Sequence, residues 1–329
     1  MKPFAYQRPA TVAEAVRAGA GRPGARYLGG GTNLVDLMKL GVESPALLID
    51  VCRLPLDLVT RTDDGGLRIG ATVRNSDLAA HPDVRAGYPA LSQALLAGAS
   101  AQLRNTATTG GNLLQRTRCP YFQDVSKPCN KRVPGSGCPA REGTHRDLAV
   151  LGHSQDCVAT HPSDMAVALA ALDAGVRLYG PEGERTVPVA DFHRLPGENP
   201  DQDTVIRPGE LVTEVVLPPP AAGSLYRKAR DRASYAFALV SVAAVLSVRD
   251  GRVEHGALAF GGVAHRPWRA RAAEDVLRGA PATEETFARA AEAELAAAEP
   301  LRDNGFKVVL ARRLAVGVLA ELTARSASA

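Results

Sequence analysis

Short apolar runs and helical repeats alternate along residues 1–220 of the chain. Residues 46–51 form an apolar run of strand length, which predicts a buried strand. Thr11 and Glu14 have the spacing of a capping box and predict a helix over 11–18. Because strand and helix patterns alternate, we expect a mixed α/β fold of the α+β class in this part of the chain.

A proline-rich break at residues 218–223 separates this part from the remainder. Beyond it, residues 239–248 and 253–263 flank an Asp-Gly turn and predict a hairpin. We therefore expect two domains, 1–220 and a smaller α+β domain at 221–329. The other predicted elements are strands over 26–28, 58–62 and 67–71 and helices over 34–40, 89–98, 162–174 and 304–323.

Composition and charge exclude several classes of protein. Hydrophobic residues make up 45% and charged residues 22% of the 329 residues, which is typical of a globular chain. The net charge of +4 is too small to indicate a nucleic acid or an anionic membrane as partner. The most apolar run, 237–248, is far shorter than the roughly 18 residues that span a bilayer, so we expect no membrane insertion.

Two glycine-rich segments carry hydroxyl and amide side chains. Gly29-Gly30-Gly31-Thr32-Asn33 lies between a predicted strand and a predicted helix, and Thr106 to Leu113 has a similar composition. Neither segment has the spacing of a Rossmann or P-loop motif. Consecutive backbone N–H groups in such loops can bind a diphosphate, although a plain turn explains either loop alone. The pair of loops favours a diphosphate site.

An irregular insertion at about 115–157 contains Cys119, Cys129, Cys138 and Cys157. The spacing lacks the short Cys-x₂₋₄-Cys pairs of structural zinc sites. Two disulfides are possible in an oxidising compartment, and a four-thiolate [4Fe–4S] cluster is the third interpretation. From Gln115 to Asp147, seven basic residues accompany three acidic ones. This excess favours the cluster, because positive charge around the negative thiolate unit would stabilise it.

Three stretches resemble a known family: Leu28 to Leu34, Ala107 to Gln115, and His161 to Ala166. Through them the chain resembles the flavoprotein subunits of molybdenum hydroxylases, the xanthine dehydrogenase and aldehyde oxidase group. The cysteine insertion marks the subgroup of FAD and [4Fe–4S] subunits in bacterial periplasmic aldehyde oxidoreductases. The resemblance implies an FAD-binding domain of the PCMH type, followed by a C-terminal domain similar to that of CO dehydrogenase flavoproteins.

The resemblance also implies cofactor sites. The first loop would wrap the FAD diphosphate and the second would form the opposite wall. Asp164 would hydrogen-bond flavin hydroxyls, unless it only caps a helix, and Lys228 would stabilise reduced flavin, unless it is a surface lysine. The FAD-binding residues expected are Arg26, Tyr27, Leu28, Gly29, Gly30, Gly31, Thr32, Asn33, Leu34, Thr108, Gly110, Gly111, Asn112, Asp164 and Lys228, and the cluster ligands are Cys119, Cys129, Cys138 and Cys157.

The function implied by the resemblance is electron transfer within an aldehyde oxidoreductase. Aldehyde would be oxidised at the molybdenum cofactor of a large partner, so this chain carries no catalytic acid or nucleophile. Electrons would pass through the [2Fe–2S] centres of a small partner, then through this chain's cluster and FAD to an external acceptor. A heterotrimer is therefore expected.

Two other functions are compatible with the residues alone: an autonomous FAD-dependent oxidase, and a scaffold protein stabilised by zinc on the four cysteines. The N-terminus has no apolar signal core. We therefore expect a periplasmic location only through a partner that bears a signal, and a cytoplasmic one if the partner lacks it.

Overall fold

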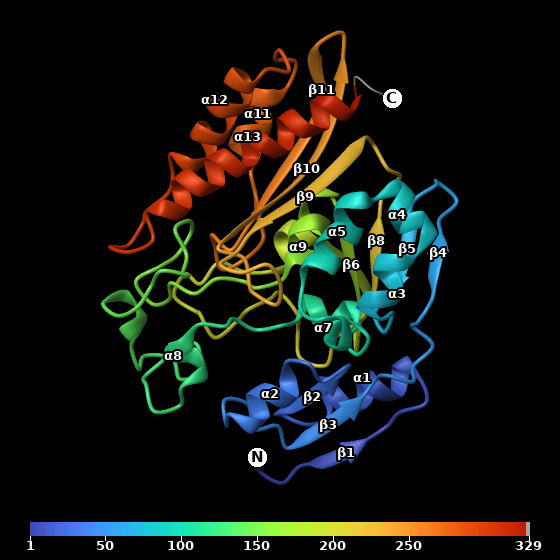
Figure 1. Ribbon diagram of the computed structural model, residues 1–329. Helices are drawn as coiled ribbons and strands as arrows, with labels where there is room; N and C mark the ends of the chain where they lie inside the picture. The colour runs from blue at the N-terminus through green and yellow to red at the C-terminus, as the bar shows by residue number, and fades with distance from the viewer. Residues whose placement is uncertain (327–329) are drawn as a thin grey trace.

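The computed structural model describes residues 1–326 and contains three β-sheets (Figure 1). The N-terminal sheet is parallel, with strand order β1-β3-β2, and Ala15 and Val16 of the first helix pack on its buried strand. The side chain of Thr11 accepts a hydrogen bond from the Glu14 N–H, which confirms the predicted helix start. The elements are β1 (Ala5–Gln7), α1 (Val12–Ala20), β2 (Ala25–Leu28), α2 (Leu34–Lys39) and β3 (Leu47–Asp50).

The central sheet has five antiparallel strands in the order β4-β5-β8-β6-β7. A bundle of short helices covers it, and α9 at the centre is buried on all sides, as a helix that is apolar all round must be. The elements are β4 (Val59–Arg61), β5 (Leu67–Gly70), α3 (Asn75–Ala80), α4 (Pro82–Gly87), α5 (Pro89–Ala97), α6 (Ala101–Arg104), α7 (Thr109–Leu113), α9 (Asp164–Ala171), β6 (Gly175–Gly180), β7 (Gly183–Pro188), α10 (Val189–Phe192) and β8 (Leu211–Leu217).

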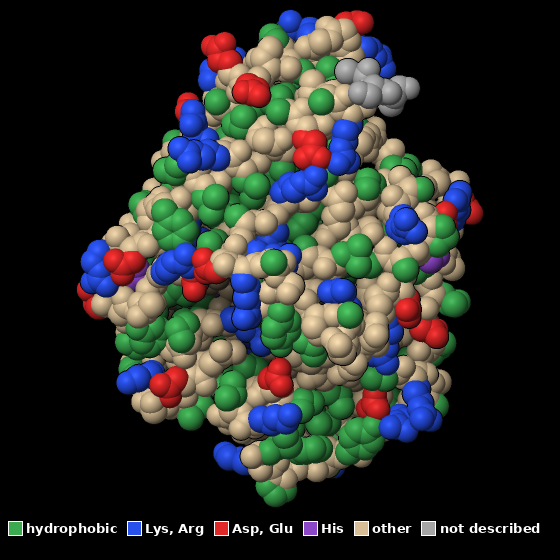
Figure 2. All heavy atoms as spheres, in the orientation of Figure 1, with side chains coloured by type: hydrophobic (Ala, Val, Ile, Leu, Met, Phe, Trp, Pro, Cys, Tyr) green, Lys and Arg blue, Asp and Glu red, His purple; other side chains and the backbone are tan. Residues whose placement is uncertain are grey.

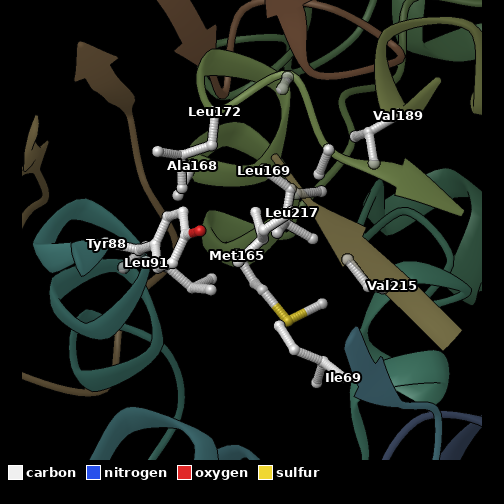
Figure 3. Close-up of a cluster of buried hydrophobic side chains, with 14 of the residues drawn as sticks. Ile69, Tyr88, Leu91, Met165, Ala168, Leu169, Leu172, Val189, Val215 and Leu217 are labelled. Carbon is white, nitrogen blue, oxygen red and sulfur yellow. The ribbon is translucent and has the colours of Figure 1, made fainter. Parts of the chain in front are cut away.

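The core between α5, α9 and this sheet is closely packed (Figure 3). Met165 and Leu169 of α9 lie beside Ile69 of β5 and Leu217 of β8, and Leu91 of α5 closes the other side. At about 1.5–3 kcal/mol for each large apolar side chain that is fully buried, this core supplies most of the stability of the unit. It fixes the N-terminal end of α9, where predicted site residues lie.

The C-terminal sheet is antiparallel, with order β12-β11-β10-β9, and three helices cover one of its faces (Figure 1). The turn at Asp250 and Gly251 has positive φ at both residues, as a two-residue hairpin turn requires, so the predicted hairpin is confirmed. α9 also packs against β10 and β11, which joins the two cores. The elements are β9 (Gly223–Ala229), β10 (Val240–Arg249), β11 (Arg252–Gly261), β12 (Trp268–Arg269), α11 (Arg271–Leu277), α12 (Glu284–Leu295) and α13 (Phe306–Ser326).

The cysteine insertion is almost entirely irregular, as predicted, apart from α8 (Pro120–Gln123) and a 3₁₀ turn, η1 (Pro139–Arg141). It projects from one side of the molecule (Figure 1). Its own small core joins Phe122, Leu148 and Val158 to Leu37 of α2. The insertion is therefore anchored to the helix that follows the first glycine loop.

One expectation is corrected. The second glycine-rich segment is not a loop throughout, because Thr109–Leu113 forms α7, with Thr108 as its N-cap. The Thr108 side chain accepts a hydrogen bond from the Gly111 N–H, which satisfies a donor of the first turn. Among the described residues, no helix is long and apolar enough to cross a bilayer.

Candidate functional site

A cavity of about 680 Å³ lies between the two glycine-rich segments, the start of α9 and the C-terminal domain. This volume is in the range of small-molecule and cofactor sites. Part of its wall comes from the segment after β9, where the aromatic side chains of Tyr235 and Phe237 lie at the cavity and are about half exposed. On the face shown in Figure 2, basic and acidic side chains are interspersed, in agreement with the small net charge.

The two glycine-rich segments touch each other, and the contact leaves no room for side chains. A Cβ on Gly30 would lie 2.0 Å from the carbonyl oxygen of Thr106, and one on Gly29 would lie 2.7 Å from Oγ1 of Thr108. Gly31 has φ of +73°, which an L side chain rarely adopts. The glycines therefore set the spacing between the two walls of the cavity.

The predicted cofactor residues separate into two groups. Those that line the cavity are Thr32, Asn33, Gly111, Asn112, Asp164 and Lys228. The others lie behind this wall: Leu34 begins α2, Thr108 caps α7, and Gly110 packs against Ala71.

Arg26, Tyr27 and Leu28 lie on β2, outside the cavity wall. The Arg26 guanidinium forms an ion pair with Glu43 at 3.7 Å. The Tyr27 hydroxyl donates a hydrogen bond to the Gly209 carbonyl at 2.8 Å, and burial raises its pKa to about 12. These side chains hold the strand that leads into the loop.

Asp164 and Lys228, far apart in the sequence, form a buried ion pair at the cavity wall. Lys228 Nζ lies 2.7 Å from Asp164 Oδ2, and the two side chains are 4% and 7% exposed. The Tyr226 hydroxyl donates to Asp164 Oδ1 at 2.5 Å. Burial, and then the adjacent negative charge of Asp164, raise the pKa of Tyr226 well above its usual value. The Lys228 ammonium is therefore held in place by a carboxylate whose other oxygen is also occupied.

Several buried polar atoms of the cavity wall have no hydrogen-bond partner among the described residues. They are Asn33 Nδ2, Asn75 Oδ1, Arg118 Nε, His161 Nε2 and Ser241 Oγ. Buried groups of this kind normally have partners, and leaving one unmade costs about 1–3 kcal/mol. Their number along one cavity indicates a polar ligand that satisfies them.

His161 is a buried histidine of the cavity wall. Burial, and then His193, whose ring is tilted against it at 4.2 Å between centroids, lower the pKa of His161 well below its usual value, so the ring is neutral. Its Nδ1 accepts the N–H of Ser163 at 3.4 Å, and Nε2 therefore carries the proton. The unpartnered amide of Asn33 on the same wall fits the phosphate and hydroxyl oxygens of FAD.

The four cysteines of the insertion come together around one small second cavity. All four are free thiols, and Cys119 and Cys157 are buried. Burial raises the pKa of Cys119 to about 11 and that of Cys157 to about 12. Among the described residues, no three His, Cys, Asp or Glu side chains are arranged to bind a single metal ion.

The two cavities share a residue. Cys119 lines both the large cavity and the cysteine pocket, and its neighbours Arg118 and Pro120 also line the large cavity. The cysteine pocket therefore lies directly behind one wall of the candidate flavin site. Sequence spacing did not predict this proximity.

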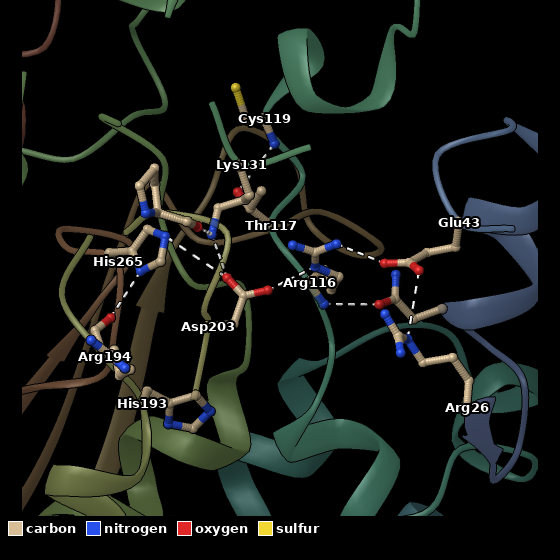
Figure 4. A network of polar contacts seen from close by, with 12 residues as sticks. Arg26, Glu43, Arg116, Thr117, Cys119, Lys131, His193, Arg194, Asp203 and His265 are labelled. Atoms are coloured by element: carbon tan, nitrogen blue, oxygen red, sulfur yellow. Dashed lines mark hydrogen bonds and ion pairs between the residues drawn. The ribbon is translucent and has the colours of Figure 1, made fainter. Parts of the chain in front are cut away.

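A polar network that the sequence did not predict connects the cysteine insertion to the first glycine loop (Figure 4). Arg116 donates from its backbone N–H to Asn33 Oδ1 at 2.8 Å, and its side chain pairs with Glu43 at 2.6 Å and Asp203 at 2.7 Å. Asp203 also pairs with Lys131. Asp203 lies in an irregular polar segment with no periodicity, so no pattern in the sequence distinguishes it. His161, by contrast, lies within a stretch that carries the family resemblance.

Comparisons with known proteins agree with this geometry. Residues 2–220 match the family described as the FAD binding domain in molybdopterin dehydrogenase, and residues 224–325 match the CO dehydrogenase flavoprotein C-terminal domain. The aldehyde oxidoreductase FAD-binding subunit PaoB of Escherichia coli (strain K12) is 56% identical over 99% of this chain and 100% of its own.

More distant relatives share the fold. The glyceraldehyde dehydrogenase medium chain of Sulfolobus acidocaldarius is 29% identical over 82% of this chain and 79% of its own. A solved structure of carbon monoxide dehydrogenase from Hydrogenophaga pseudoflava superposes with a TM-score of 0.77, at 28% identity and 99% coverage of both chains. The α+β fold class and the resemblance inferred from the sequence are thereby confirmed, and the chain belongs to the FAD-binding subunits of the molybdopterin dehydrogenase family.

Proposed function

We propose that this chain is the electron-transfer flavoprotein subunit of a molybdenum-dependent aldehyde oxidoreductase, with its own [4Fe–4S] cluster beside FAD. The observation that carries the proposal is the shared wall at Cys119: a pocket of four thiols directly adjoins the cavity of an FAD-binding family. The extensive identity to an aldehyde oxidoreductase subunit supports the substrate class.

FAD fits the large cavity because the orphaned donors and acceptors of its wall match phosphates and hydroxyls. When bound, FAD supplies the exchange between carriers of single electrons and acceptors of electron pairs. Thr32, Asn33, Gly111 and Asn112 would hold its polar groups. Lys228 would place its fixed positive charge beside the ring system, where it favours the reduced, more negative form.

Four thiols that line one pocket support an iron–sulfur cluster there. Each thiolate of a cubane binds a different iron, so the four sulfurs stand farther apart than they do around a single zinc ion. The four residues are Cys119, Cys129, Cys138 and Cys157, and all are free thiols. Because the buried thiols have raised pKa values, cluster binding must release their protons, and the bound metal compensates the thiolate charge.

The proposed partners follow from the family. Aldehyde oxidation would occur at the molybdenum cofactor of a large subunit, and a small subunit would supply [2Fe–2S] centres in a heterotrimer. Electrons would reach this chain's cluster, then FAD, then an external acceptor. A partner that bears a signal would take the complex to the periplasm, and the complex would be cytoplasmic without one. No acid, base or nucleophile of this chain acts on the aldehyde in this proposal.

The test is a cofactor analysis of the complex, expressed with its partners and purified without oxygen. Because the small subunit carries its own iron, the measurement compares wild type with Cys129→Ser and Cys138→Ser, and with Cys52→Ser as the matched control outside the pocket. We expect each pocket variant to lose about four irons per complex and keep FAD, while the control keeps both.

Three results would overturn the proposal. Unchanged iron in the pocket variants would show that this chain holds no cluster. Zinc in the wild-type subunit together with absent flavin would leave a scaffold protein. Full aldehyde turnover by this chain without partners would instead support an autonomous oxidase.

A further inference from the structure

The basic residues of the insertion do not form a uniform positive shell around the cysteine pocket. Arg132 donates to the Tyr121 carbonyl at 2.7 Å and closes the insertion on itself. Arg146 pairs with Asp231 at 2.9 Å, outside the pocket. Among the described residues, Lys131 is the one Lys or Arg side chain that lines the pocket. The charged side chains at the pocket itself are therefore this lysine and the carboxylate of Asp156, which also accepts from the Asn130 amide.

Lys131 is an unusually confined cation. Its side chain is 1% exposed. Its Nζ donates to the Pro200 carbonyl at 2.8 Å and pairs with the Asp203 carboxylate. Because the ammonium is fixed and desolvated, its field at the pocket is screened much less than that of a surface lysine.

Asp203 divides its negative charge between two cations. One oxygen pairs with Lys131, and the other accepts from Arg116 Nε at 2.7 Å. His265 lies 3.9 Å from the same carboxylate, and burial lowers the pKa of His265 to about 4, so this ring is neutral at pH 7. The 27% exposed Asp203 carboxylate therefore compensates the Lys131 charge only in part (Figure 4).

We propose that Lys131 raises the reduction potential of the cluster that the four cysteines hold, and that Asp203 sets how strongly it does so. The inference rests on the function proposed above. Reduction adds one electron, and hence one negative charge, to the pocket without breaking a bond. A fixed cation at the pocket wall stabilises the reduced cluster more than the oxidised one. Asp203, as a nearby anion, has the opposite effect.

The experiment is a redox titration of the whole complex with dithionite as the electron donor. The cluster is followed by electron paramagnetic resonance, and the flavin by its absorption. Lys131→Met removes the cation at similar length, and Asp203→Asn removes the anion. Lys127→Met is the matched control, because Lys127 lies in the same insertion but is exposed and does not line the pocket.

We expect Lys131→Met to lower the midpoint potential of the cluster, Asp203→Asn to raise it, and Lys127→Met to leave it unchanged. The flavin potential should shift less in each case, because Lys131 does not line the flavin cavity. If Lys131 and Asp203 had a purely structural role, the variants would lose iron, and the cluster potential would not move in opposite directions in Lys131→Met and Asp203→Asn. If Lys131→Met fails to assemble, the rise in Asp203→Asn still tests the proposal.

Iron content and midpoint potential separate the proposed function from this inference. A wild-type complex with no iron bound by this chain overturns both the proposed function and this inference. This inference alone is overturned if the wild-type complex holds the cluster but the midpoint potentials of Lys131→Met and Asp203→Asn are unchanged or shift in the same direction.

Discussion

Gly30→Ala tests the contact between the two glycine-rich segments. The new Cβ would lie 2.0 Å from the Thr106 carbonyl oxygen, whereas ordinary contacts begin at 3.4 Å. The segments would have to separate by roughly 1.4 Å, because the close atoms belong to backbone that cannot rotate away. Overpacking of this kind costs about 1–3 kcal/mol. If the cost falls on the FAD-binding arrangement, the affinity decreases about 5- to 150-fold.

The assay is the dissociation constant for FAD, measured by flavin fluorescence on the complex after the bound flavin has been removed and titrated back. Gly317→Ala is the control, because a Cβ there meets no atom within 4 Å and the residue lies inside α13. This control should keep wild-type affinity and gain about 1 kcal/mol of stability from helix propensity. Wild-type FAD affinity in Gly30→Ala would refute the claim that the segments form the two walls of the flavin site.

Three further predictions concern single side chains. Lys228→Met should destabilise the domain by about 3–5 kcal/mol in denaturant unfolding, because it leaves buried Asp164 unpaired. The double variant Lys228→Met with Asp164→Asn should recover part of this loss. Equal stability of the single and double variants would contradict the pairing. Tyr27 has a pKa of about 12 in the folded state and about 10 in the unfolded state, so the unfolded state loses its proton first. The free energy of unfolding should therefore fall as pH rises from 10 to 12. Tyr27→Phe should remove this pH dependence in urea titrations, and an unchanged pH dependence in the variant would contradict the prediction. Lys307→Met should lower the melting temperature of the complex. Lys307 Nζ donates to the carbonyl oxygens of Asp147, Leu148 and Gly262, and these buried acceptors would lose their partner. A wild-type melting temperature would contradict this role.

Local patterns predicted much of the fold, because the interactions that define them are close in sequence. Thr11 caps a helix as its spacing to Glu14 indicates, and the Asp-Gly turn closes the expected hairpin. The second glycine-rich segment was harder. Its glycines have low helix propensity, so the sequence did not predict the short helix α7, although Thr108 before them is a good N-cap residue.

The site was predictable only where residue type and motif coincide. Asp164 and Lys228 could be assigned through the family resemblance, but their mutual ion pair depends on the packing of α9 against β10 and β11 and of α5 against β9. Asp203 and Lys131 are 72 residues apart in irregular segments. Side chains in such segments follow no period, so only the folded chain brings them together. The same reason explains why spacing could not predict that Cys119 lines both cavities.

The most direct test of the central claim is anomalous diffraction from crystals of the complete complex, with data collected at the iron and zinc absorption edges. We expect iron density enclosed by Cys119, Cys129, Cys138 and Cys157, with FAD in the cavity on the other side of Cys119. Disulfide density between these cysteines, or a signal at the zinc edge alone, would contradict it.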